Sequence, residues 1–309
     1  MVPVRVKTPQ EAAKALLSHH YAIIKLPDDV LNISKNILAD GLNFFNMDEK
    51  IKLKNASPHI LEGYRALGEE GDPKTGTPDL SESFTAWFRN TSNPQVQSWS
   101  KECIFHQTMS NGLVAFADFT ERLLKAIRIE IDPTYKVSNV PVINIRSISY
   151  LQMNFSRPAL HNRELRDSIM GPHEDGHILT ILKPTKPGLL IGQGELVESP
   201  TKQNPVGVFK QEGDLQPINI SDDEAILVPG SPTFYLTGGR IKPLIHAVAN
   251  KGHDVRQSLM FFINPTPELP IEPWVHTEQN RDISIHKIVD VVSAQYGQPA
   301  ISQSVNLRQ

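Results

Sequence analysis

The feature that most constrains this chain is a series of short β-type segments after residue 140, each followed closely by proline or glycine. Short strands that recur at such intervals are typical of a sandwich, a jelly roll or a barrel, whereas a parallel α/β sheet alternates its strands with helices. We therefore expect a β-rich core over residues 136–309, with strands within 143–155 and at 178–182, 188–191, 206–209, 225–228, 233–236, 243–249 and 258–263.

The first 135 residues have a different pattern, which predicts a helical region packed on the same core. Thr8-Pro9-Gln10-Glu11 is a capping box with proline at the first helical position. Residues 55–93 are rich in glycine, proline, serine and threonine, which predicts a long loop. Apolar spacing predicts helices starting at residue 9 and over 30–42, 47–53, 95–131 (with a break near 110–112) and 284–295, together with a strand at 21–26.

Composition excludes several classes of protein. The 309 residues include 31 Lys and Arg against 34 Asp and Glu, with no long basic run, so a nucleic-acid-binding surface is not expected. No apolar stretch is long enough to cross a membrane, and the N-terminus lacks the apolar core of a signal peptide. The single Cys103 excludes an internal disulfide and a cysteine-based zinc cluster. We expect a cytoplasmic protein, a monomer or weak homo-oligomer, that acts on a small molecule.

Residues 173–177, His-Glu-Asp-Gly-His, fit two different metal sites. The zinc-protease pattern H-E-x-x-H works only on a helix, where both histidines lie on one face and the glutamate acts as the general base. Gly171-Pro172 precedes the first histidine, Gly176 separates the two, and a β-branched run follows at once, so the local sequence does not favour a helix. The zinc-protease interpretation is a remote alternative.

In an extended backbone, residues two apart point to the same side, which brings His173 and Asp175 together. Two histidines and one carboxylate form the facial triad of non-haem Fe(II) sites, and this triad leaves coordination positions open. Of the two histidines downstream, His246 lies in an apolar strand-like run and His253 in a turn-like one. His246 is therefore the better third ligand.

Arg256-Gln257-Ser258 leads into the strand expected at 258–263, and in an extended backbone Arg256 and Ser258 share one face. An arginine that points into an apolar environment needs a carboxylate partner, and a bidentate guanidinium with a hydroxyl beside it suits a carboxylate ligand. This pair predicts a carboxylate-binding clamp close to the metal.

His173-x-Asp175, His246 and Arg256-x-Ser258, in this order and spacing, resemble the isopenicillin N synthase-like iron(II)/2-oxoglutarate-dependent oxygenases. Segments 44–50, 63–64 and 79–84 resemble the N-terminal part of the same family, so that the resemblance covers residues from about 8 to 297. It implies a mixed α+β fold, in which a double-stranded β-helix of the jelly-roll or cupin type carries N-terminal helices and a C-terminal helix.

The resemblance also implies a function. Fe(II) would be held by His173, Asp175 and His246, and the distal carboxylate of 2-oxoglutarate by Arg256 and Ser258. The reaction would consume O₂, release succinate and CO₂, and oxidise a C–H bond of a small molecule by hydroxylation, desaturation or ring formation, as in specialised metabolism.

One alternative is an oxidase of the same fold that does not use 2-oxoglutarate, where Arg256 and Ser258 hold the carboxylate of the substrate. Another is a non-catalytic binding protein, which the intact triad disfavours.

The sequence departs from the family before the first ligand. Many family members have Asn-Tyr-Tyr-Pro there, whereas residues 154–158 of this chain are Asn-Phe-Ser-Arg-Pro. Because Phe155 has no hydroxyl group, Asn154 is the candidate that remains for contact with the cosubstrate.

Candidate substrate contacts are weighed against ordinary structural roles. His177 is expected either to line the pocket or to be a satisfied polar residue, and Arg157 to lie in a solvated loop or to contact an anionic substrate. Core packing is favoured over substrate stacking for Tyr235, in the expected strand 233–236. Tyr64 and Trp87 flank the long loop expected at 55–93, and loops of such length often cover active sites.

Overall fold

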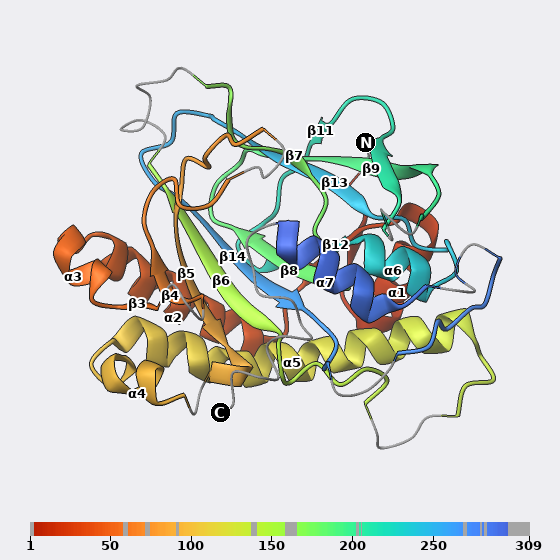
Figure 1. Cartoon of the computed structure of the whole chain (residues 1–309), viewed down its shortest axis with the longest axis horizontal. Coiled ribbons are helices and arrows are strands. Elements are labelled where there is room, and N and C mark those ends of the chain that lie inside the picture. The colour runs from red at the N-terminus through yellow and green to blue at the C-terminus, as the bar shows by residue number, and fades with distance from the viewer. Residues whose placement is uncertain are drawn as a thin grey trace.

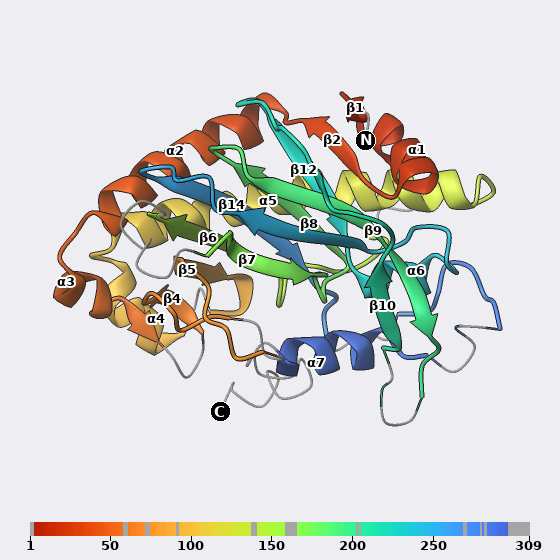
Figure 2. The same ribbon diagram turned by 90° about the horizontal axis from the view of Figure 1, so that it is seen from above.

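The structure is a computed structural model that describes residues 3–57, 61–71, 75–90, 93–136, 141–157, 166–201, 204, 206–267, 271–278, 280 and 283–295. Two curled sheets lie face to face above a layer of helices (Figures 1 and 2). The expected mixed α+β fold with a jelly-roll core is confirmed. None of the helices in the described ranges combines the length and the apolar character that crossing a bilayer requires.

The larger sheet has nine strands, drawn from both halves of the chain. All neighbouring strands are antiparallel except the first pair, which is parallel. Their order is β1 (Arg5–Val6), β2 (Ala22–Lys25), β12 (Glu224–Pro229), β8 (Leu179–Pro184), β14 (Arg256–Ile263), β6 (Tyr150–Ser156), β5 (Glu82–Trp87), β4 (Glu62–Arg65) and β3 (Ala56–Ser57).

The smaller sheet has five strands and carries two of the expected metal ligands. Its main path runs β10 (Val208–Gln211), β9 (Leu189–Glu198), β13 (Leu244–Ala249) and β7 (Ser168–His173), and β11 (Gln216–Pro217) pairs with β9. In the register between β13 and β7, His246 lies opposite His173.

Helices cover the outer face of the larger sheet (Figure 1). The long α5 (Ile104–Ile131) and α2 (Asp28–Phe45) pack on each other and against this sheet, and α1 (Pro9–His19) packs on α5. The capping box of α1 is formed, because Thr8 Oγ1 accepts from the amide of Glu11 and the Glu11 carboxylate accepts from the amide of Lys7. The remaining helices are α3 (Glu49–Leu53), the 3₁₀ helix η1 (Phe88–Asn90), α4 (Pro94–Ser100), α6 (Ser231–Leu236) and α7 (Ile285–Gln295).

Strict alternation along β6 and β14 gives the larger sheet two different faces. On β6, Leu151, Met153 and Phe155 are buried in the core beneath the helices, and the Phe155 ring stacks on Phe45 with 4.7 Å between ring centroids. The residues between them point to the opposite face, toward the smaller sheet. One strand therefore anchors the helical layer and also supplies the wall of a cavity.

Three expectations from the sequence are wrong. Part of the segment expected to be a loop, 55–93, forms β3, β4 and β5, which extend the larger sheet. The segment 233–236 lies in the helix α6 and not in a strand, because Pro232 follows Gly230 and Ser231 as a proline in the first turn of a helix.

The third error concerns the break in the long helical segment, which falls at 101–103 and not near 110–112. Gly112 serves close packing inside α5, since a Cβ at this position would lie only 2.8 Å from Ile37 Cδ1 on α2. Gly112 therefore permits α5 and α2 to approach each other and does not end the helix.

Candidate metal centre

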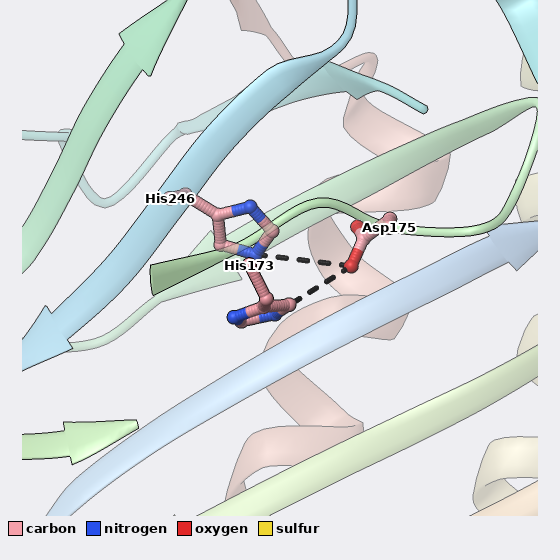
Figure 3. A group of neighbouring side chains, drawn as sticks. All are labelled: His173, Asp175 and His246. Atoms are coloured by element: carbon pink, nitrogen blue, oxygen red, sulfur yellow. Dashed lines mark ion pairs between the residues drawn. The ribbon is translucent and has the colours of Figure 1, made fainter. Parts of the chain in front are cut away.

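His173, Asp175 and His246 converge on one point between the two sheets (Figure 3). His173 is the last residue of β7, Asp175 lies in the turn that follows, and His246 is on the neighbouring β13. One ligand atom from each residue lies within 4.8 Å of the other two. Asp175 Oδ1 is 3.8 Å from the Nε2 atom of each histidine. A single ion can contact all three atoms.

The neighbours of these side chains leave the correct atoms available to a metal. His173 Nδ1 lies 2.8 Å from the carbonyl oxygen of Gly171, and His246 Nδ1 lies 3.5 Å from that of Leu244. A hydrogen on each Nδ1 leaves the Nε2 lone pair for the metal, as is usual for metal-binding histidines. Thr180 Oγ1 donates to Asp175 Oδ2 at 2.6 Å, which leaves Oδ1 for the metal.

The protonation states also suit a cation. Burial raises the pKa of Asp175, but the charges of His246 and His173 oppose it, and the net pKa lies below the usual value. Burial, followed by the proximity of His173, lowers the pKa of His246 to about 4. At neutral pH the carboxylate is therefore ionised and the His246 imidazole is neutral, which are the forms that bind metals.

A tight turn holds Asp175 and excludes the zinc-protease geometry. β7 ends at His173 and β8 begins at Leu179, so the two histidines of the H-E-x-x-H pattern do not share a helix. Gly230 packs beneath this turn, where a Cβ would lie 1.9 Å from the carbonyl oxygen of Asp175. Glu174, which would be the general base of a protease, accepts instead from the amide of Ser231 at 2.7 Å.

The three residues border a cavity of about 330 Å³ that also reaches Arg256 and Ser258. Arg256 Nη1 donates to Ser258 Oγ at 2.7 Å, while Nε and Nη2 are buried with no partner among the described residues. Burial lowers the pKa of Arg256 to about 10, so the guanidinium stays charged at neutral pH. A buried cation without a partner is costly. These unpaired donors fit the carboxylate of a ligand inside the cavity.

Asn154 and His177 both line this cavity. Asn154 lies opposite Ser258 in the register of β6 and β14, and its Oδ1 accepts from Gln152 Nε2 at 2.8 Å. His177 lies between Tyr150 and Asn264, with Nε2 3.2 Å from Tyr150 Oη and Nδ1 2.9 Å from Asn264 Oδ1. Burial lowers the pKa of His177, which favours a neutral ring.

Four other candidate residues lie outside the cavity lining. Tyr235 is fully buried on α6 and donates to the carbonyl oxygen of Val206, and Tyr64 donates to the buried carboxylate of Glu82. The Trp87 ring stacks on the ring of Tyr150, its partner in the register of β5 and β6, with 3.9 Å between ring centroids. Arg157 donates to the backbone carbonyl and the side-chain oxygen of the adjacent pair Phe45 and Asn46.

Several cavity residues were not anticipated from the sequence. Strand alternation alone could have identified some of them, because they lie on the same strand faces as Asn154 or Ser258; these are Tyr150, Gln152, Ser156, Met260 and Phe262. Arg65 and Glu70 come from the segment expected to be a loop, and no sequence pattern marks them. Phe155, at the position where family members have tyrosine, faces the helices and not the cavity.

No protein-family model and no curated protein sequence matches the chain. Its structure is nevertheless similar to solved structures of oxygenases that bind 2-oxoglutarate. A full-length Neurospora crassa protein, in complex with α-ketoglutarate (2-oxoglutarate) and thymine, has a TM-score of 0.68 at 17% identity, over 96% of this chain and 98% of that one.

Two further structures are similar at about the same level of identity. The dioxygenase for auxin oxidation 1 of Arabidopsis thaliana, bound to 2-oxoglutarate, has a TM-score of 0.65 at 17% identity, covering 91% of this chain and 100% of that one. JOX2, in complex with 2OG, Fe and JA, has a TM-score of 0.59 at 18% identity, over 90% and 81% of the two chains. At these identities the likeness shows a shared fold.

Proposed function

We propose that this chain is an Fe(II)- and 2-oxoglutarate-dependent oxygenase that oxidises a C–H bond of a small molecule. One observation carries the proposal: the two-histidine, one-carboxylate group and the unpaired Arg256 guanidinium border the same cavity. The first fits a divalent iron with open positions, and the second fits the distal carboxylate of a ligand whose other end reaches the same iron.

In this proposal Fe(II) would be held by His173 Nε2, Asp175 Oδ1 and His246 Nε2. Arg256 and Ser258 bind the distal carboxylate of 2-oxoglutarate, and Asn154, beside Ser258, offers its amide group to the cosubstrate. Together, bound iron and 2-oxoglutarate supply the oxidation, in which O₂ is consumed, 2-oxoglutarate loses CO₂ to give succinate, and a substrate C–H bond is oxidised. The carbonyl oxygens of Gly171 and Leu244 orient the two histidines, and Thr180 orients Asp175.

The substrate that we propose is a small molecule, because the cavity has a volume of about 330 Å³ and part of it would hold 2-oxoglutarate. The similar Neurospora crassa structures contain thymine or 5-formyluracil, which are small molecules of this kind. Within the wider group of 2-oxoglutarate oxygenases, the order of ligands and clamp residues supports a place among the isopenicillin N synthase-like enzymes.

Anaerobic titration of the protein with Fe(II) and then 2-oxoglutarate tests this proposal. We expect a weak visible charge-transfer band that needs both additions, and substrate-stimulated release of succinate once O₂ is admitted. Metal binding without any such band would contradict the proposal. Turnover that proceeds without 2-oxoglutarate would instead favour an oxidase in which Arg256 binds the substrate.

The Arg256→Leu variant separates the two parts of the site. It should still bind Fe(II) through the intact triad, but the band should require a far higher concentration of 2-oxoglutarate. An unchanged response to 2-oxoglutarate would show that the carboxylate binds elsewhere.

A further inference from the structure

The cavity wall that comes from the N-terminal region carries an ion pair, Arg65 with Glu70. Arg65 Nε donates to Glu70 Oε1 at 2.8 Å, and the arginine's terminal nitrogens contact Thr85, Gln152 and the carbonyl oxygen of Leu61. Gln152 Nε2 also donates to Glu70 Oε2, at 3.1 Å. Every nitrogen of this guanidinium therefore has a partner within the protein.

Arginine and lysine are scarce in the cavity lining. Among the described lining residues only Arg65 and Arg256 carry such a charge. Arg65 is paired with Glu70, and in the proposed function Arg256 is occupied by 2-oxoglutarate. The described lining thus offers no spare guanidinium or ammonium group to an anionic substrate.

Carboxylates are more abundant on the same wall. Glu69 and Glu70 line the cavity there beside Arg65, so that two acidic groups accompany one basic group. At the metal, the charges of Fe(II) and Arg256 would balance those of Asp175 and 2-oxoglutarate. The excess negative charge therefore belongs to the part of the cavity left for the substrate, where it favours a cation and repels an anion.

An unsatisfied hydroxyl group lies in the same lining. Ser81 is only 3% exposed, and its Oγ is buried with no partner among the described residues. A buried hydroxyl group without a partner is costly, and a ligand that hydrogen-bonds to it removes that cost. The smaller sheet contributes an apolar part of the same lining, formed by Ile169 and Met170 of β7 and Val248 of β13.

We propose that the substrate carries a basic nitrogen, an amine or a guanidine, which binds as a cation against Glu70, with its apolar body on Ile169, Met170 and Val248. This inference rests on the proposed function, because it assigns Arg256 to 2-oxoglutarate. Both Glu70 oxygens accept one hydrogen bond or more within the protein, and a carboxylate has lone pairs for further donors.

Three probes of similar shape test the charge preference: 2-phenylethylamine, 2-phenylethanol and phenylacetate. Each is titrated anaerobically by calorimetry into protein loaded with Fe(II) and 2-oxoglutarate, while the visible band is recorded. The amine should bind at least about ten-fold more tightly than the acid, as expected for one charged hydrogen bond. Preference for the acid, equal binding, or no binding of the amine overturns the proposal.

The Glu70→Gln variant should reverse the preference. It removes the carboxylate and releases Arg65, so that the amine binds about ten-fold more weakly and the acid more tightly than to the wild type. Glu70→Asp should retain the preference for the amine. Glu49→Gln, at an exposed position on α3 outside the cavity lining, is the matched control and should change either affinity much less.

The outcomes separate this inference from the proposed function. If the visible band forms with Fe(II) and 2-oxoglutarate but Glu70→Gln leaves both probe affinities unchanged, only the assignment of the substrate class fails. If the wild type gives no band, the proposed function itself fails. Thermal unfolding of each variant checks that the fold is retained.

Discussion

The two faces of the larger sheet, built from the same strands, have opposite chemistry. On the face toward α2 and α5, β6 and β14 present Met153, Phe155 and Phe261, all buried in the apolar core. On the face toward the smaller sheet, the alternating positions include Asn154 and Arg256, which line the cavity. Side chains that are next to each other in sequence therefore contribute to different properties of the protein.

From this difference we can predict which substitutions should affect stability and which should affect ligand binding. The outer face gains stability from apolar burial and needs no specific partner. The inner face contains polar groups that are oriented by neighbours or lack a partner in the protein, and such groups serve a ligand at a cost in stability. Changes on the outer face should lower the free energy of unfolding and leave ligand binding intact. Changes on the inner face should weaken ligand binding and have little effect on the free energy of unfolding.

The largest effect is expected for Asp175→Ala, which removes the one carboxylate of the metal group. Fe(II) binding should fall by more than the roughly 10–100-fold that follows loss of an outer-shell partner, and succinate release should fall to background. Metal analysis of the purified variant and a succinate assay measure this. Retention of iron with wild-type affinity would remove Asp175 from the ligand set.

Phe155→Ala tests the opposite face. Removing the ring that stacks on Phe45 should cost about 3–5 kcal/mol in the free energy of unfolding, with Fe(II) and 2-oxoglutarate affinities unchanged in the folded fraction. Denaturant unfolding and ligand titration measure the two quantities.

The control is Ser156→Ala on the same strand, one residue further and in the cavity lining. It should cost about 1 kcal/mol or less. Comparable losses of stability from both substitutions would break the proposed division between the faces.

Arg256→Leu should have a smaller but selective effect. Loss of a charged hydrogen bond is worth about 1.5–3 kcal/mol, so the Kd for 2-oxoglutarate should rise about ten- to a hundred-fold, with Fe(II) binding retained. Arg157→Leu is the comparison, because that arginine contacts Phe45 and Asn46 outside the cavity. An equal rise in both variants would mean that general charge, and not the clamp, attracts the cosubstrate.

The smallest predicted effect belongs to Thr180→Val, which keeps the shape of the side chain but removes the hydrogen bond to Asp175 Oδ2. Fe(II) affinity should fall about ten-fold, the lower end of the range for outer-shell partners. Thr120→Val removes a buried hydroxyl group on α5, which donates to the carbonyl oxygen of Phe116, and should leave iron affinity unchanged. If the two variants behave alike, Thr180 has no special part in orienting Asp175.

Local sequence patterns predicted the structure correctly where the local preference of a segment matches its environment in the folded protein. The β-branched run at 178–182 and the apolar run at 258–263 predicted β8 and β14, and the two-residue spacing placed His173 with Asp175 and Arg256 with Ser258. The capping box likewise marked the start of α1. At each of these positions the short-range signal and the final environment coincide.

The sequence patterns did not predict the structure of segments that are stabilised by contacts with residues far away in the sequence. β5 contains Glu82, Ser83 and Thr85, which are unusual in a buried strand, and it is stabilised by pairing with β6 and by partners such as Tyr64 for Glu82. The ion pair of Arg65 and Glu70 comes from the same segment. No periodicity could reveal it, because its position in the cavity depends on how that segment pairs with the sheet.

A crystal structure of the anaerobic protein with Fe(II) and 2-oxoglutarate tests the central claim most directly, namely that the inner face of the sheet and the triad opposite it form one iron and cosubstrate site. We predict iron on His173 Nε2, Asp175 Oδ1 and His246 Nε2, with the distal carboxylate of 2-oxoglutarate on Arg256 and Ser258. Iron on any other set of ligands, or 2-oxoglutarate bound away from Arg256, would contradict the account.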